Sequence, residues 1–446
     1  METFRFPIRP ARDASAHAAM SRFDAPTAAA RVLSSDHADR RARAAALACM
    51  IGLAVVLGVG RFAFTPLLPL MLADGSIGLK AGSWLASANY AGYFVGALSC
   101  AALRVAPARM VRVGLVATVL LTAAMGAGHW LPAWLVVRFV AGVVSAWTFV
   151  FMSQWGLRRL AELSAPEWSG VIYAGPGVGI VVTGLIGSAL AGQRAAVGWL
   201  GFAALSAVLS VAIWRTFGAA PASASAPASA SASAHAQAGP PAAGAPAALA
   251  ARAARAATRS RRADAAWLVV LYGAPGFGYI VTATFLPVIA RAALPAGSPW
   301  PDLFWPMFGA ALIVGAITAA RLPGHWDNRL LLAAGCATQA LGIAAGIVWP
   351  NAAGFSIGSA LLGLPFTAIT LFAMCEARRL HGERAAGLMG YATASYGVGQ
   401  ILGPLVAAPL AARFGSFMPA LGVAAAALLI GAAGFAASAA RGRRSS

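Results

Sequence analysis

Residues 45–72 read AALACMIGLAVVLGVGRFAFTPLLPLML, an apolar run that a single charged residue, Arg61, interrupts. A helix needs about 20 apolar residues to cross a hydrocarbon core about 30 Å thick, so this run can span a membrane. Similar runs follow near residues 81–103, 110–128, 132–157, 168–192, 196–217, 265–290, 301–320, 329–349, 351–376, 385–412 and 416–440. The sequence therefore predicts an all-α, polytopic membrane protein of about twelve transmembrane helices.

The composition favours the same class. Of the 446 residues, 60% are hydrophobic and only 10% are charged, and the mean hydropathy is +0.74. A soluble domain carries about 25% charged residues. The net charge of +20 would suit nucleic-acid binding if it formed a soluble basic face, but it lies in loops and tails. We therefore expect the lipid bilayer as a partner, and no nucleic acid.

A low-complexity segment divides the runs into two sets of six. It begins PASASAPASASASAHAQAG at residue 221 and is followed by the basic stretch ARAARAATRSRR. Ala, Ser and Pro in this proportion form no core, so we expect a flexible linker. The predicted organisation is a disordered cytoplasmic tail over 1–43, a six-helix bundle over 44–217, a cytoplasmic linker over 218–263, a second six-helix bundle over 264–440 and a cytoplasmic tail over 441–446.

Arginine and lysine lie mostly on one side of the predicted spans. Two of the 33, Arg61 and Arg138, lie inside spans, and four lie in loops of one side: Lys80, Arg194, Arg291 and Arg413. The other 27 share the side of both termini and of the linker. Because loops rich in Lys and Arg stay in the cytoplasm, we expect a multi-pass protein of a bacterial inner membrane with both termini cytoplasmic.

The cysteines and histidines argue against a metal site. Each of the four cysteines lies within or at the end of an apolar run, and none forms a C-x-x-C pair. The six histidines lie in tails and loops. We therefore expect neither a metal nor a cofactor, and no His-based catalytic centre inside the membrane.

The two halves of the chain share short stretches. GRFAFTPLLP at 60–69 and GYIVTATFLP at 278–287 both end in an aliphatic-Pro step, and Gly177-Val-Gly and Gly397-Val-Gly take matching places in the fifth and eleventh runs. Two parallel repeats around a midplane cavity account for this pattern. Alternatively, the two halves converged on the same small residues, because helix packing in lipid favours such residues.

Two motifs carry a resemblance to a known family. GVGRFAFTPLLP at 58–69 is followed by SANYAGYFVGA at 87–97, and Arg138-Phe-Val-Ala-Gly142 lies in the fourth run. The first pair resembles the opening two helices of the YbfB/YjiJ-like branch of the major facilitator superfamily. The third stretch resembles the R-x-x-x-G motif of that superfamily. The loop after the second run departs from the family pattern, because Cys100 stands where an aspartate is usual.

The resemblance implies the major facilitator fold, two six-helix bundles, and a secondary active transporter that moves a small molecule by alternating access. We expect it to be a monomer and not an enzyme. A membrane-embedded enzyme is one alternative, but it would need clustered His, Asp or Cys near one interface. A membrane-embedded sensor is the other, but it would normally carry a soluble output domain, and the loops are short apart from the linker.

Arg61 is the most informative residue, because it lies near the middle of the first run. An isolated charge at that depth costs about 2.5–3.5 kcal/mol, so it must face a cavity or a partner. Gly58 and Thr65 share its helical face. Arg61 either binds an anion or couples transport, or it pins the helix by bonding carbonyls freed near Pro66. For Arg138, the resemblance implies proton coupling or the pinning of helices.

Other polar side chains inside the runs complete the candidate site. Any one of them is more often a helix–helix hydrogen bond than a ligand contact. The set includes Tyr93, Gln154, Thr282, Thr284, Gln339, Thr367, Thr370 and Tyr396. Those we favour for substrate binding or coupling, on helices that line the cavity of the fold resembled, are Arg61, Thr65, Asn89, Tyr90, Arg138, Tyr173, Tyr272, Tyr279, Tyr391 and Gln400.

No Asp or Glu falls in the middle of a run. Proton-driven cation transporters usually need an intramembrane carboxylate. Two arginines without a buried acid make the cavity electropositive, which predicts an anionic small-molecule substrate such as a carboxylate or phosphate ester, with a proton or counter-ion as coupling partner. Glu376, at the inner end of the tenth run, is the nearest candidate proton carrier, and a salt bridge with Arg378 or Arg379 is the alternative.

Overall fold

The computed structural model describes residues 28–218, 245–319, 321–323, 325–382 and 385–444. Within these ranges the chain forms helices and no strands, as the hydropathy pattern predicts. The parts of the expected tail and linker that fall in 1–27 and 219–244 lie outside the described residues.

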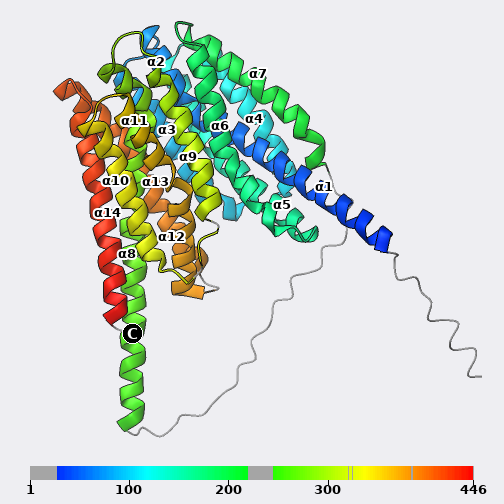
Figure 1. Ribbon diagram of the computed structural model, residues 1–446, viewed down its shortest axis with the longest axis vertical. Helices are drawn as coiled ribbons and strands as arrows, with labels where there is room; N and C mark the ends of the chain where they lie inside the picture. The colour runs from blue at the N-terminus through cyan, green and yellow to red at the C-terminus, as the bar shows by residue number, and fades with distance from the viewer. Residues whose placement is uncertain (1–27, 219–244, 320, 324, 383–384, 445–446) are drawn as a thin grey trace, which may run out of the picture.

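The first half of the chain forms six helical units (Figure 1). The first unit changes its pitch along its length, from α1 (Ala28–Leu53) through the π-helix η1 (Ala54–Phe62) to α2 (Phe64–Ala73). The other five are α3 (Leu79–Ser99), α4 (Pro107–Ala127), α5 (Leu131–Glu162), α6 (Ser169–Ala189) and α7 (Ala195–Ile213). Short 3-10 turns follow α3, α5 and α7: η2 (Cys100–Ala102), η3 (Pro166–Trp168) and η4 (Trp214–Phe217).

The second half forms six more units. They are α8 (Ala245–Ala293), α9 (Trp300–Ala319), α10 (Asn328–Val348), the pair α11 (Ala352–Gly363) and α12 (Phe366–His381), α13 (Ala385–Phe414) and α14 (Met418–Arg444). Pro365 stands between α11 and α12 and caps the second of them. Because proline has no N–H to donate, a helix is readily interrupted there.

Eleven units within the described residues are long and apolar enough to cross a membrane. The remaining unit, α3, has 21 residues, as many as α4, but Lys80, Asn89 and several serines lower its hydropathy. It packs against α5 and α13, so part of its polar surface meets other helices. The expected all-α architecture of about twelve spans is therefore confirmed.

The expected tail and linker are wrong at their inner boundaries. α1 begins at Ala28, so residues 28–43 continue the first unit. α8 begins at Ala245, so residues 245–263 extend the seventh unit well past the neighbouring end of α14 (Figure 1). α14 itself runs through Arg444. Alanine and arginine are strong helix formers, so a helix that forms in a span continues into an Ala- and Arg-rich flank.

The two bundles meet along two seams. α6 packs against α9, and α3 packs against α13. Gly177 faces the carbonyl oxygen of Gly309 at the first seam, and Gly397 faces the ring of Phe94 at the second. The matching glycines of the two halves thus take equivalent places, as parallel repeats require.

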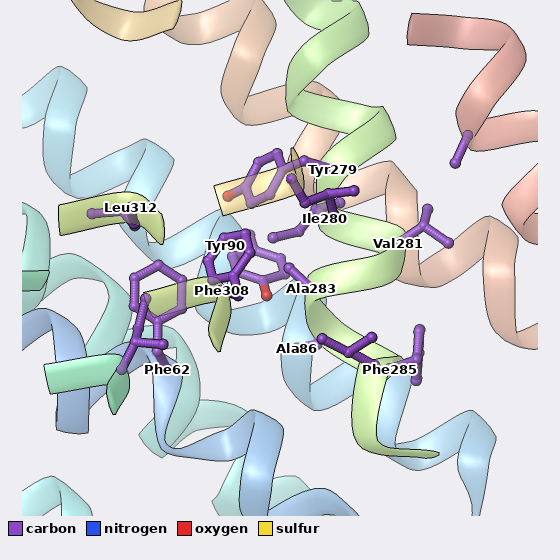
Figure 2. Packing of buried hydrophobic residues seen from close by; sticks show 14 of the residues in the cluster. Phe62, Ala86, Tyr90, Tyr279, Ile280, Val281, Ala283, Phe285, Phe308 and Leu312 are labelled. Carbon is purple, nitrogen blue, oxygen red and sulfur yellow. The ribbon is translucent and has the colours of Figure 1, made fainter. Parts of the chain in front are cut away.

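The packing differs between the two ends of the molecule, which we name the Asp74 end and the Arg329 end. One buried cluster joins the bundles toward the Asp74 end, where Phe62 and Tyr90 lie among residues of α8 and α9 (Figure 2). A second cluster, which includes Phe151 and Phe217, contains residues of the first bundle alone. The first helix and α5 diverge from α8 and α14 toward the Arg329 end (Figure 1).

Candidate functional site

The candidate site is built on the π-helix η1, which carries Arg61 in its last turn. A π-helix bonds residue i to i+5, and Pro66, five residues after Arg61, has no N–H to donate to the Arg61 carbonyl. The guanidinium of Arg138, from α5, supplies donors instead. Its Nη1 donates to the carbonyl of Gly60 and its Nη2 to that of Arg61, each at 3.3 Å. Arg138 thus bonds carbonyls near Pro66, which the sequence had offered as partners for Arg61.

The R-x-x-x-G motif also brings α3 close to α5. A Cβ added at Gly142 would lie 2.1 Å from the carbonyl oxygen of Asn89, so only glycine fits at this crossing. The Asn89 side chain donates from Nδ2 to the carbonyl of Arg138 at 2.9 Å. Asn89 and Arg138 therefore act together as a support for the segment that carries Arg61.

Gly58 sets the approach of α6 to the same segment. A Cβ on Gly58 would lie 2.4 Å from the Cα of Gly179. Small residues that let two backbones approach are typical of helix contacts in membranes. Gly58 therefore marks a helix contact within the first bundle.

Arg61 is 6% exposed, and its guanidinium reaches across to the second bundle. Its Nη2 donates to Oε1 of Gln400, on α13, at 2.9 Å. Gln400 in turn donates from Nε2 to the hydroxyl of Tyr279, on α8. The buried Nε of Arg61 has no hydrogen-bond partner. Arg61 is therefore hydrogen-bonded to a neutral amide, and one of its donors, Nε, has no acceptor.

Aromatic rings surround this guanidinium. The Cζ atom of Arg61 lies 4.1 Å from the ring centroid of Tyr93, 5.1 Å from that of Tyr90 and 5.3 Å from that of Phe62. Rings at these distances stabilise a cation through their negative faces. No Asp or Glu within the described residues forms a salt bridge with Arg61 or Arg138. The aromatic rings offset part of the cost of burying the charge, but they do not neutralise it.

A ladder of aromatic rings leads away from the site through the second bundle. Tyr279 stacks with Tyr396 at 5.9 Å, and Tyr396 lies 4.9 Å from Tyr272, whose hydroxyl donates to Thr370. Tyr279 also contacts the ring of Phe366 at 4.8 Å. Five of the seven tyrosines of the chain thus lie in this ladder or against Arg61.

Two further hydrogen bonds join the bundles beside Arg61. Thr65 donates to the carbonyl of Ala283 at 3.1 Å, and this carbonyl has no helical donor because Pro287 stands four residues later. The hydroxyl of Tyr90 lies 3.1 Å from that of Thr284. Figure 2 shows Tyr90 between the first bundle and α8.

The structure brings together eight of the ten favoured residues and leaves two outside. Tyr173 is half-buried on α6 and packs against Phe149, within the first bundle. Tyr391 is 70% exposed, so its placement in the cavity is wrong. It shares a helix face with the exposed Val398 and Leu402, whereas Gln400 points inward. A single sequence could not distinguish these faces, because α13 is small and apolar all round.

The favoured set also missed two neighbours of Arg61, Tyr93 and Tyr396. Tyr93 lies three residues after Tyr90, on the same side of α3, and this spacing is the signal that could have found it. Tyr396 lies four residues before Gln400 on α13, at the same kind of spacing. Both tyrosines belong to the wider polar set, and only the tertiary contacts separate them from Tyr391.

Glu376 takes part in an ion-pair network at the Arg329 end. It binds Arg379 at 2.6 Å and lies 3.8 Å from Arg329, which also pairs with Asp327 at 3.0 Å and donates to the carbonyl of Ser438. The alternative of a salt bridge with Arg379 is thus confirmed. Burial alone would raise the pKa of Asp327, but the hydrogen bonds and charge of Arg329 outweigh it and lower that pKa.

Comparisons with known proteins identify the family. A family model described as "Uncharacterised MFS-type transporter YbfB" matches residues 53–244 and 240–435. The chain belongs to this family of major facilitator transporters. It is therefore a secondary transporter of a small molecule, and its spans are membrane helices. No curated protein matches the chain in sequence.

Solved structures of a transporter share the fold of this chain. A crystal structure of a mutant of the nucleoside transporter NupG superposes with a TM-score of 0.66 at 15% identity, over 88% of this transporter and 99% of NupG. A second crystal structure of NupG gives a TM-score of 0.65 at 13% identity, over 89% of this transporter and 98% of NupG. At this identity the likeness concerns the fold alone. Among the described residues, no group of three or more His, Cys, Asp or Glu could hold a metal ion.

Proposed function

We propose that this transporter carries an anionic small molecule by alternating access and that Arg61 binds its anionic group. One observation carries the proposal: the buried guanidinium of Arg61 donates to the oxygen of a neutral amide, and its Nε has no hydrogen-bond partner. Arginine stays charged at any physiological pH, so it needs an acceptor in every state of the cycle. A carboxylate or phosphate can take two donors of the planar fork at once, which the Gln400 oxygen does not.

The surroundings of Arg61 favour a planar, largely apolar body on that anion. The nearest side chains are the rings of Phe62, Tyr90 and Tyr93, with the tyrosine ladder on the other bundle. A ring-bearing carboxylate would stack on such faces. A sugar phosphate would leave several hydroxyls against aromatic carbon, at the cost of unpaired polar groups.

Alternating access would require the contacts between the bundles to break and re-form. The tie from Arg61 through Gln400 to Tyr279 and the bond from Thr65 to Ala283 both cross the two bundles toward the Asp74 end. An anion that binds Arg61 must displace Gln400, which would loosen this closure. Binding and the change of access would then be one event.

The remaining parts of the proposal concern setting and coupling. We place the protein in the bacterial inner membrane as a monomer, with the Arg329 end and both termini in the cytoplasm. Coupling to a proton or counter-ion fits the family. Glu376 is held in ion pairs with Arg379 and Arg329, so we do not assign it the role of proton carrier.

The test measures thermal unfolding of the purified protein with sodium benzoate, sodium acetate, sodium phosphate and neutral benzamide. A ligand that binds the folded state raises its stability, by about 2.7 kcal/mol at a hundred times its dissociation constant. Benzoate should stabilise the protein and benzamide, its neutral analogue, should not. The shift should vanish in Arg61→Ala, shrink in Arg61→Lys, which lacks the fork, and persist in Arg109→Ala, a matched exposed arginine.

Arg138 serves in this proposal as a positioning residue. Arg138→Met should lower both the unfolding temperature and the affinity for the anion, because it releases the carbonyls of Gly60 and Arg61. Arg61→Ala should lower the affinity with little loss of stability. An anion that stabilises the wild type and Arg61→Ala equally would overturn the assignment of Arg61.

A further inference from the structure

A groove of about 450 Å³ lies between α8 and α13 near the Arg329 end, away from Arg61. Its walls are small and apolar, and its polar rim is formed by His381 and Tyr391; the lining residues on the two helices are Ala265, Ala266, Val269, Val270, Gly387 and Leu388. The groove begins where the helices separate below the close contact of Gly273 with Ser395. It does not belong to the site around Arg61.

The groove opens on the outside of the bundle. Val270 is 67% exposed and Tyr391 is 70% exposed. Along α13, the exposed Val398 and Leu402 continue the face of Tyr391, while Gln400 points to the centre. In a transporter whose spans are membrane helices, this outer face meets the acyl chains of the bilayer, so the space is a site for lipid and not for a water-soluble solute.

The charges beside the groove are positive. Arg262 is exposed and lies four residues before Ala266, on the helix face that continues into the groove. Arg261 is also exposed. The nearest acid along α8 is the half-buried Asp264, which interacts with Arg379.

We infer that this groove binds one phospholipid with an anionic head group. One acyl chain lies on Ala266, Val269 and Leu388, and the phosphate lies near Arg262 and His381. The ring of Tyr391 stands at the level between chain and head group, where tyrosine is enriched in membrane proteins. The charge complementarity of a basic rim above an apolar trough favours an anionic lipid over a zwitterionic one.

The test uses the full-length protein in nanodiscs that contain equal amounts of phosphatidylglycerol and phosphatidylcholine. Lipid that remains bound after gentle release is counted by native mass spectrometry. We expect about one phosphatidylglycerol retained in preference to phosphatidylcholine. Arg262→Gln should reduce that preference about fivefold, the effect of one basic residue at an anionic surface. Arg158→Gln, an exposed arginine on α5, is the matched control and should change nothing.

A second variant tests the groove itself. Ala266→Trp fills it from an exposed position and should abolish retention, whereas Val211→Trp, on the exposed face of α7, should not. Equal retention of the two lipids, or phosphatidylglycerol bound equally by both tryptophan variants, would overturn the inference. So would a dimer that Ala266→Trp dissociates, because the groove would then hold a second copy of the chain.

Discussion

Gln400→Glu tests the link between the two bundles most directly. The substitution preserves the shape of the side chain and places a negative charge where Oε1 now lies 2.9 Å from Nη2 of Arg61. At an effective dielectric of ~20 this attraction is about 6 kcal/mol. Desolvation of the new carboxylate removes several kcal/mol of that gain. We expect a net stabilisation of about 1–2 kcal/mol, or a rise in the unfolding temperature of about 1–2 °C for a chain of this length.

Gln339→Glu is the matched control. Gln339 is an equally buried glutamine on α10; its Nε2 donates to the carbonyl of Leu362, and its buried Oε1 has no hydrogen-bond partner. A carboxylate there loses the donated bond and gains no cation, so the unfolding temperature should fall. Gln400→Leu should also lower it, because Nη2 of Arg61 then lacks its amide acceptor, at a cost of about 1–3 kcal/mol.

Both measurements are thermal unfolding curves of detergent-purified protein, read by tryptophan fluorescence at one pH. The reasoning is refuted if Gln400→Glu destabilises the protein as much as Gln339→Glu does. That result would mean that the guanidinium of Arg61 does not lie beside Gln400 in the populated state. If Arg61 also binds the substrate, the new carboxylate should weaken anion binding about tenfold for each 1.4 kcal/mol of added attraction.

Three further outcomes follow from the packing, the charge pattern and the ion pairs. Gly179→Ala should lower the free energy of unfolding by about 1–3 kcal/mol, because its Cβ would press on backbone atoms of η1. Gly201→Ala, with open space around it, should be neutral or slightly stabilising. Equal effects of the two variants on the unfolding temperature would contradict the packing. A cysteine at Ala296 should react with an impermeant reagent from the periplasm and one at Arg158 only from the cytoplasm, and the opposite pattern would reverse the proposed orientation. Asp327→Asn should lower the unfolding temperature at pH 7, and since the folded-state pKa is lowered, its difference from the wild type should disappear as the pH falls below about 4.

The sequence predicts some but not all of the contacts of the two arginines. Their depth in the spans predicts that both must find partners, and the proline at 66 predicts freed carbonyls nearby. Which arginine bonds those carbonyls depends on the direction from which α5 meets η1, and that direction is a property of the packed bundle. Arg138 takes the carbonyls and Arg61 is left to face the other half of the chain.

The side of the helix on which each tyrosine of α13 lies could not be predicted from a single sequence. Tyr391 and Tyr396 lie five residues apart on α13, a spacing that turns them to different sides of the helix. One is exposed on the outer surface and the other stacks on Tyr279. Because α13 has no polar face to mark its inside, hydropathy could not assign either residue.

The sequence by itself determined the membrane class, the all-α architecture, the two sets of six spans and the family. The reason is that the lengths of the apolar runs and the short motifs are local features of the sequence. It also marked Arg61 as a charge in need of a partner. Only the tertiary structure decided that this partner is Gln400 of the opposite bundle, 339 residues away in the chain. The physical reason is that contacts between helices distant in sequence decide which side chains are buried, which partners they bond and which way they point. No local pattern specifies which of these helices meet.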